Sequence, residues 1–331
     1  MKYITHILLM LLCIPLSAST PQVLHYGETT GYNHGTRDES MAMFYQMCQW
    51  HGWQITEDNS GSEFNSVANL LQYEVVIFSN TSGNSGLNAT QRANFEAYID
   101  SGGSYLGIHA ASDTYRHSSA NGGSKGTWDW YAETVAGATV QQNPNHTSQN
   151  HNNDITQPVA HPVTTAIPNP WNKTEEYYYW ENGYLSPAFT EILRVGQTGS
   201  NSRDAPRMVA HCRNLPGGGK AFYTSLGHAA SNFETNPIFY QLIEDAMIWI
   251  MPPSTPFFID FSPVREIAPE LEAGYFYLDE VPIIRDYFVY DITGRQVESG
   301  LVDDQGRVPH FTKPGIWTYK TYSRRWVGGV R

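Results

Sequence analysis

Apolar and polar positions along the first two thirds of the chain follow two different periods. Short apolar runs predict buried strands at 22–28, 73–80 and 104–109. Between these runs, apolar residues recur at helical spacing over 36–52 and 88–101. This β-α-β-α-β order predicts a parallel sheet with helices on both faces, which is a three-layer α/β architecture.

Local signals mark the ends of the two predicted helices. Thr36 and Glu39 stand at the spacing of a capping box, so the first helix is expected to begin there. Asn88 is expected to cap the second helix. That helix should stop at Gly102 and Gly103, because glycine readily adopts the left-handed backbone that ends a helix.

The rest of this domain is predicted to hold three more strands and a closing helix. The strands are expected at 191–197, 206–213 and 219–228, whereas the very polar stretch 141–157 is expected to be a loop or an exposed hairpin. The closing helix is expected to begin at Asn236–Pro237, because asparagine caps helices and proline suits the first helical position.

Composition changes along the chain divide it into four parts. Residues 1–19 combine a basic start, an apolar core and small residues, as a cleaved secretory signal peptide does, and the apolar run is too short to span a membrane as a helix. The α/β domain is expected at 20–251, a proline-rich linker at 252–256, and a small all-β, sandwich-like domain at 257–331. The sequence thus predicts a protein that is not transmembrane and is secreted or held on the cell surface.

Charge and residue usage narrow the class of partner. The formal net charge is −12 and charged residues make up only 16% of the chain, so no nucleic-acid partner is expected, because an acidic surface repels phosphate. The chain also holds 21 Tyr, 14 Phe and 9 Trp, whose faces can stack on sugar rings, although a β-rich core would use them equally well.

Common cofactor motifs are missing from the sequence. It has neither the GxGxxG nor the P-loop pattern of nucleotide sites, so no nucleotide cofactor is expected, and it has no HExxH. Outside the signal peptide only Cys48 and Cys212 remain, at no metal-binding spacing. They are expected either to form a disulfide or to stay as buried thiols.

Histidines stand at the predicted ends of three strands. His34 follows the first strand, His109 ends the third, and His228 ends the run 219–228. Because ligands bind at the carboxyl ends of strands in an open parallel sheet, these histidines are expected to meet at one edge. Three such histidines suit a divalent metal such as zinc, or a set of catalytic acids and bases; the alternative is that each is a structural residue.

Carboxylates accompany these histidines in the sequence. Asp113 comes soon after His109, at the same expected sheet edge. Glu175 and Glu176 are adjacent, so on a strand they point to opposite faces and only one should reach the site, as a general base or a fourth ligand. The alternative is a solvated acidic pair beside packed tyrosines.

Five segments of the first domain, in the order YNHGT, GGSYLGIHAASD, AHPVT, TEEYYYW and AFYTSLGH, resemble the ThuA-like family, named for trehalose utilisation. The resemblance implies a flavodoxin- or amidotransferase-like domain of the class I glutamine-amidotransferase type. In amidotransferases the corner after the third strand carries the catalytic cysteine, whereas here it reads Ile108-His109-Ala110-Ala111, so glutamine amidotransferase activity is not expected. The resemblance maps the family's characteristic positions onto His34, His109, His161, Glu176 and His228.

The chain departs from the family pattern at two positions. Glu175 stands where the family often has aspartate, and His211 stands where it more often has an aromatic residue. Both changes bear on the shape of the expected substrate pocket.

The C-terminal segment carries a second, shorter resemblance. VYDITGRQV and KPGIWTYK resemble the sorting domains of type IX secretion cargo. This resemblance implies the type IX secretion machinery as a partner.

Two functional hypotheses follow from these features. The first is an exported carbohydrate-active enzyme, a hydrolase or isomerase that acts on a glycoside, a disaccharide or a keto-sugar derivative by acid–base or metal-assisted chemistry. Its expected catalytic residues are His109, Glu176, His34 and His228, with Asp113, His161, Tyr178 and Trp128 binding substrate and the three strand-end histidines holding any metal. The alternative is a non-catalytic glycan-binding protein that uses aromatic loops around Trp128, Trp130, Tyr178 and Trp180.

Overall fold

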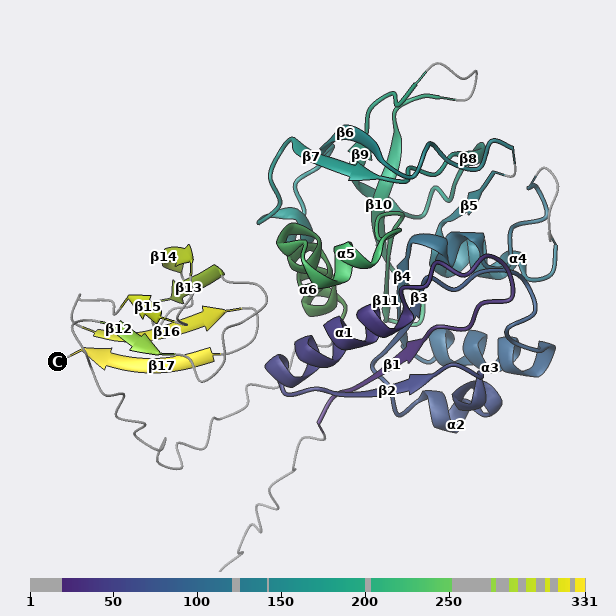
Figure 1. Ribbon diagram of the computed structural model, residues 1–331. Coiled ribbons are helices and arrows are strands. Elements are labelled where there is room, and N and C mark those ends of the chain that lie inside the picture. The colour runs from purple at the N-terminus through teal and green to yellow at the C-terminus, as the bar shows by residue number, and fades with distance from the viewer. Residues whose placement is uncertain are drawn as a thin grey trace, which may run out of the picture.

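A computed structural model of the chain describes residues 20–120, 126–141, 143–199 and 204–251, together with six short C-terminal strands (Figure 1). The predicted signal peptide and the linker at 252–256 lie outside the described residues. In the ranges that are described, no helix is both long enough and apolar enough to cross a membrane.

Nine strands of the described residues form one mixed sheet, in the order β2-β1-β3-β4-β11-β10-β9-β6-β7. The first five strands in this order run parallel, and each later strand is antiparallel to its neighbour. The parallel strands are β1 (Gln22–Tyr26), β2 (Gln54–Asp58), β3 (Val75–Ser79), β4 (Ser104–Ile108) and β11 (Lys220–Thr224). The others are β10 (Arg207–Asn214), β9 (Thr190–Val195), β6 (His151–Thr156) and β7 (Trp171–Glu175).

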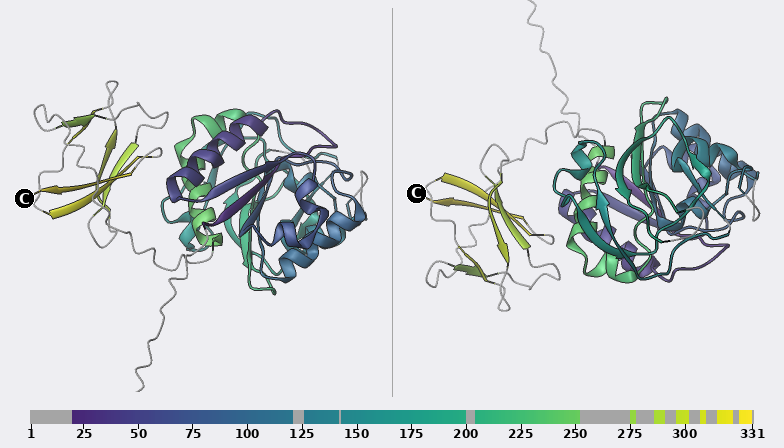
Figure 2. Two further views of the ribbon diagram at one scale, coloured as in Figure 1. Left: turned by 90° about the horizontal axis from the view of Figure 1, so that it is seen from below. Right: turned by 90° about the horizontal axis from the view of Figure 1, so that it is seen from above.

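Helices cover both faces of this sheet, so the predicted three-layer α/β architecture is confirmed (Figures 1 and 2). On one face lie α1 (Arg37–His51), α5 (Ala230–Glu234) and α6 (Pro237–Ile250); on the other lie α2 (Val67–Leu70), α3 (Ala89–Asp100) and α4 (Asp129–Tyr131). Side chains alternate between the faces along each strand: Val75 and Ile77 join the core under α1 and α6, whereas Val76 and Phe78 join the core under α3. All five residues of β3 and of β4 are buried, as expected of central strands.

Two of the three helix caps predicted from the sequence are confirmed, and one is wrong. Asn88 accepts hydrogen bonds from the backbone N–H groups of Thr90 and Gln91, and Asn236 caps α6, so both predicted caps are confirmed. The predicted capping box at Thr36 is wrong, because the Thr36 side chain makes no cap hydrogen bond. Its Oγ1 instead accepts from Asn80 Nδ2 at 2.7 Å, which ties the start of α1 to the loop after β3.

The region between β4 and β11 contains strands that the apolar pattern did not show. β6 lies inside the polar stretch that was expected to be a loop or an exposed hairpin, and it pairs antiparallel with the edge strand β7. The opposite edge strand, β2, comes earlier in the chain, between β1 and β3. A separate pair, β5 (Ala138–Val140) and β8 (Trp180–Leu185), forms a small antiparallel sheet after the π-helical turn η3 (Ala132–Ala136). Polar edge strands carry little apolar periodicity, so the sequence pattern alone did not find them.

The C-terminal strands pair antiparallel in two small sheets, β14-β13-β16-β17 and β12-β15. Their bounds are β12 (Tyr275–Tyr277), β13 (Asp286–Tyr290), β14 (Gln296–Leu301), β15 (Arg307–Pro309), β16 (Gly315–Thr321) and β17 (Arg325–Val330). The residues between these strands lie outside the described part of the chain, and the sorting-domain identity of the segment stays a prediction.

Candidate metal centre

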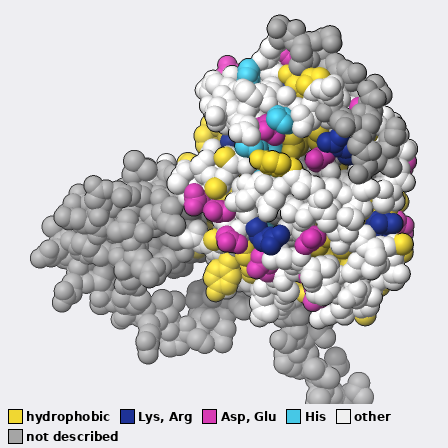
Figure 3. Space-filling view, turned by 45° about the vertical axis from the view of Figure 1, so that its right-hand side comes forward, with side chains coloured by type: hydrophobic (Ala, Val, Ile, Leu, Met, Phe, Trp, Pro, Cys, Tyr) yellow, Lys and Arg dark blue, Asp and Glu magenta, His cyan; other side chains and the backbone are white. Residues whose placement is uncertain are grey.

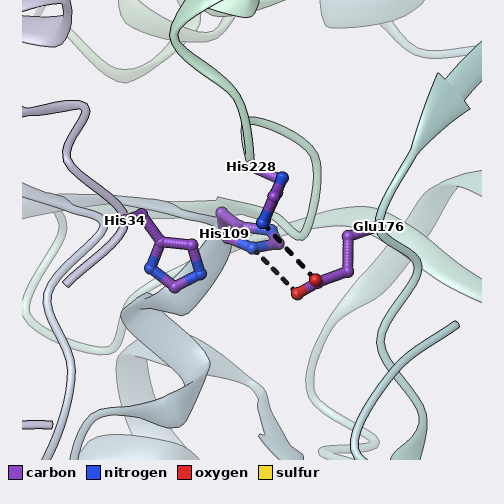
Figure 4. Close-up of side chains that lie close together, drawn as sticks. All are labelled: His34, His109, Glu176 and His228. Atoms are coloured by element: carbon purple, nitrogen blue, oxygen red, sulfur yellow. Dashed lines mark ion pairs between the residues drawn. The ribbon is translucent and has the colours of Figure 1, made fainter. Parts of the chain in front are cut away.

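Three histidines and one glutamate converge at the carboxyl edge of the sheet (Figure 4). His34 comes from the loop after β1, His109 follows β4 directly, and His228 follows β11. Glu176 is the residue after the end of β7. One potential ligand atom from each of the four side chains lies within 4.8 Å of those of the others. The sequence did not show in which direction β11 runs. In the structure β11 is parallel to β4, so His228 lies at the same sheet edge as His109.

The backbone at His109 makes a sharp corner between β4 and the 3₁₀ turn η2 (His109–Asp113). His109 has φ of 46°, a left-handed conformation that costs a residue with a Cβ about 1 kcal/mol or more. Ala110 and Ala111, which follow, are fully buried. The turn directs the His109 ring toward the cluster.

A hydrogen bond to the backbone orients the His109 ring. Its Nδ1 lies 2.6 Å from the Ser225 carbonyl oxygen and therefore donates to it. In the neutral ring this leaves a lone pair on Nε2, which is buried, has no hydrogen-bond partner among the described residues, and lies 3.6 Å from Glu176 Oε1. The ring also stacks on Tyr178, with centroids 4.4 Å apart. The Nε2 lone pair is therefore buried, fixed in direction and not used by any hydrogen-bond donor in the described part of the chain, as expected of a nitrogen that binds a metal ion.

The carboxylate of Glu176 approaches two histidines of the cluster, and the residue is almost fully buried. Its Oε2 is 3.4 Å from His228 Nε2, and its Oε1 is 3.6 Å from His109 Nε2. These gaps are longer than good hydrogen bonds. They leave room for an ion between the carboxylate and the two rings.

Burial favours the neutral form of two histidines of the cluster, His34 and His228. Burial, together with the nearby His109 and His228 rings, lowers the pKa of His34 to about 2. Burial and the His109 ring also lower the pKa of His228. Metals bind the neutral imidazole, and three neutral imidazoles with one carboxylate form a donor set that suits zinc and similar divalent ions. The unpartnered buried nitrogens, His109 Nε2 and His34 Nδ1, are consistent with such an ion.

A fourth histidine, His146, also reaches Glu176, and sequence reasoning left it outside the site. Its Nδ1 lies 3.3 Å from Glu176 Oε2 and 2.6 Å from the Thr147 carbonyl oxygen. A β-bridge between His146 and Tyr178 holds this segment beside the cluster. The polar stretch that carries His146 has no period, so no sequence signal indicated this placement.

A pocket of about 190 Å³ opens beside the cluster. Its described lining is Tyr32, His34, Asp113, Val140, Asn145, His146, Gln149, Glu176 and Tyr178, none of which is Lys or Arg. Asp113 forms an ion pair with Arg116, although burial raises the pKa of the Asp113 carboxyl. On one face of the molecule, histidine side chains reach the surface next to acidic and apolar ones (Figure 3).

The structure places two of the expected substrate-binding residues at this pocket and two elsewhere. Asp113 and Tyr178 line it. His161 instead packs its ring on Trp249 of α6, with Nε2 3.4 Å from Cys212 Sγ. Trp128 is only 5% exposed and stacks on neighbouring aromatic rings, while its Nε1 donates to Glu96. Trp128 is therefore part of the core under α3 and α4.

Both cysteines in the described residues are free, buried thiols, which resolves the alternatives left open by the sequence. Burial raises the pKa of Cys48 and of Cys212 to about 12. Thiols in such surroundings stay protonated at neutral pH and are poor nucleophiles.

Comparisons with known proteins agree with this fold. The family described as ThuA, trehalose utilisation, matches residues 22–250. A ThuA-like protein from Bacteroides uniformis superposes with a TM-score of 0.56 at 18% identity, covering 70% of this chain and 93% of the other. A ThuA-like protein from Parabacteroides merdae gives 0.51 at 15% identity, covering 70% and 90%. A search of curated proteins finds no match. At such low identity the structural likeness establishes the fold alone.

Proposed function

We propose that this chain, which belongs to the ThuA trehalose-utilisation family over residues 22–250, is a metal-dependent enzyme that acts on a carbohydrate. The observation that carries this proposal is the convergence of four ligand atoms within 4.8 Å at the edge of a polar pocket. A divalent ion held there would supply Lewis-acid polarisation of a substrate oxygen.

The chain's own residues have distinct roles in this proposal. His34, His109, His228 and Glu176 hold the ion, and the Ser225 carbonyl fixes the His109 ring so that Nε2 faces inward. His146 lies outside this set but lines the pocket. Because Nδ1 of His146 donates to the Thr147 carbonyl, the neutral ring keeps Nε2 free to accept a proton from a bound molecule.

The lining of the pocket supports an uncharged, hydroxyl-rich substrate. Asn145, Gln149 and His146 offer hydrogen-bond donors and acceptors, none of the described lining residues is Lys or Arg, and nearby Arg116 is paired with Asp113. A phosphorylated or carboxylated ligand normally meets unpaired Arg or Lys. Tyr32 stands at the pocket with 63% of its surface exposed, which suits stacking on a sugar ring.

The substrate is proposed to be a glycoside, a disaccharide or a keto-sugar derivative, and the reaction hydrolysis or isomerisation. Export by way of the N-terminal segment, with type IX secretion as the route, remains a proposal from the sequence. The alternative of binding through aromatic loops loses support, because Trp128 and Trp180 are 5% and 8% exposed and pack in the core.

Elemental analysis of the purified protein tests the metal centre directly. We expect one divalent ion per chain, and none after His109→Ala. His51→Ala is the matched control, because His51 is a partly exposed histidine on α1 that pairs with Glu244. Absence of any metal from the wild-type protein after loading with zinc would contradict the proposal and favour Glu176 with a neutral histidine as an acid–base pair.

A further inference from the structure

The peptide that carries His228 is held by a buried carboxylate, Glu175, which is not itself a member of the cluster. Glu175 Oε2 accepts from the backbone N–H of Gly227 at 3.0 Å, and Oε1 accepts from that of His228 at 3.2 Å. The side-chain amide of Asn232 donates to the same carboxylate at 3.2 Å. Glu175 is 2% exposed, so all of its interactions are with the protein interior. The adjacent glutamates thus bind the two ends of one residue: Glu176 faces the His228 ring and Glu175 binds its backbone.

A buried lysine compensates the charge of Glu175. Lys173 Nζ lies 3.1 Å from Glu175 Oε2 and also donates to the Asn232 side-chain oxygen. These contacts with Lys173 and Asn232 hold the Glu175 carboxylate in place against the Gly227–His228 backbone.

Asn80 holds the same peptide from the opposite side. Its Nδ2 donates to the Gly227 carbonyl oxygen at 3.0 Å and to Thr36 Oγ1 at 2.7 Å, while its Oδ1 accepts from the backbone N–H of Ala110 at 3.2 Å. Asn80 is 4% exposed and has φ of 49°. One buried amide thus links the three loops that carry the three histidines of the cluster.

We propose that Glu175 and Asn80 are positioning residues of the metal centre, which fix the three histidine loops before any ion binds. The proposal rests on the proposed metal centre and extends it to residues that touch neither ion nor substrate. The tightness of the Gly227 turn supports it: Gly227 has φ of +110°, and a Cβ there would lie 2.8 Å from Ile108 Cγ2. Partners that orient metal ligands in this way typically change metal affinity by about 10- to 100-fold when removed.

Calorimetric titration of the metal-free protein with zinc tests the role of Glu175. Glu175→Gln keeps the size but offers one acceptor to two N–H groups, so we expect zinc affinity to fall about 10- to 100-fold. Glu175→Asp keeps both acceptors and the charge, and is expected to retain more affinity than the glutamine variant. Asp58→Asn is the matched control, because Asp58 is also buried and accepts from the N–H groups of Ser60 and Glu63 at 2.9 and 2.8 Å. Its zinc affinity should equal that of the wild type.

Asn80→Asp separates positioning from simple charge attraction. The added negative charge near the cluster would strengthen zinc binding if only the local field mattered. Positioning predicts the opposite, because a carboxylate cannot donate to the Gly227 carbonyl oxygen. We expect a loss of about 10-fold or more. Equal or tighter zinc binding by Asn80→Asp, or wild-type affinity in Glu175→Gln, would overturn the inference.

A measurement on the wild-type protein covers the case in which a variant does not fold. In the metal-free protein, the amide hydrogens of Gly227 and His228 should exchange with solvent as slowly as those of the central strands, because Glu175 already binds them. Rapid exchange at both positions would show that the loop is not fixed before the metal arrives, and would overturn the inference. Failure of the wild-type protein to bind zinc is a separate result, which would remove the metal centre itself.

Discussion

His109 Nε2 lies 3.6 Å from Glu176 Oε1, while Nδ1 of the same ring donates to the Ser225 carbonyl oxygen. The ring is therefore fixed on one side and open on the other. The open side faces a carboxylate at a distance too long for a strong hydrogen bond and suitable for an ion between the two groups.

Glu176→Gln should abolish high-affinity metal binding. The substitution removes the only carboxylate of the four-residue set and should lower zinc affinity by more than about 100-fold, because losing a ligand costs more than losing a group that orients one. Equilibrium dialysis against zinc measures the change. Glu234→Gln, at an exposed position on α5, is the control and should bind as the wild type does. Full binding by Glu176→Gln would exclude the carboxylate as a ligand.

Zinc should raise the thermal stability of the protein, and chelation should remove that gain. A ligand present at 100 times its dissociation constant stabilises the folded state by about 2.7 kcal/mol, which shifts the midpoint of a domain of this size by about 5–10 °C. Thermal unfolding followed with zinc and with a chelator gives the difference. In His34→Ala the two curves should nearly coincide. A zinc shift of wild-type size in that variant would place the bound ion elsewhere.

Tyr32→Ala should weaken substrate binding without removing the metal. Stacking of an exposed ring on a sugar contributes on the order of 1 kcal/mol, so KM should rise by about 5- to 10-fold while kcat changes little. Steady-state kinetics on a sugar substrate found by screening is the measurement. Tyr45 on α1, which is 54% exposed, supplies the control Tyr45→Ala. Equal KM values in the two variants would rule out a contact between Tyr32 and the substrate.

His25 should make the domain less stable in acid. Burial, aided by the nearby charge of Arg37, lowers the pKa of His25 to about 4, and its Nε2 lies 3.0 Å from Ser40 Oγ. Between about pH 6.5 and pH 4 the unfolded chain binds a proton at this residue and the folded chain does not. The contribution of His25 to the free energy of unfolding is therefore complete above pH 6.5 and is lost as the pH falls toward 4. The loss is at most about 3 kcal/mol.

Urea unfolding at pH 6.5 and pH 4.5 of wild-type protein and His25→Gln measures this contribution. The variant should have a lower free energy of unfolding at pH 6.5 and a smaller decrease at pH 4.5. A pH dependence identical in the two proteins would mean that His25 does not contribute to it.

Much of the fold could be predicted because its central elements carry strong local signals. The runs 73–80 and 104–109 are apolar and became β3 and β4, and Asn88 caps α3 as expected. The cap at Thr36 was wrong because a distant residue, Asn80, competes for its hydroxyl group. Local spacing could not show that competition.

The candidate site was predictable only where it lies at strand ends. His34, His109 and His228 meet as the topology of a parallel sheet requires. His146 was missed because its segment has no period, and Trp128 was expected at the site because composition does not distinguish a core aromatic from an exposed one. The partnership of Glu175 with the Gly227–His228 backbone depends on residues about 50 positions apart, which a single sequence does not link.

The four members of the cluster stand at positions 34, 109, 176 and 228 of a domain that ends near residue 251. The last of them joins the others only when β11 has inserted beside β4 in the middle of the sheet. A chain still being synthesised, or one with its central strands unpaired, therefore offers isolated imidazoles rather than a chelate. Acquisition of the ion would be a late event in the maturation of the protein, and metal content could serve as an assay for completed folding.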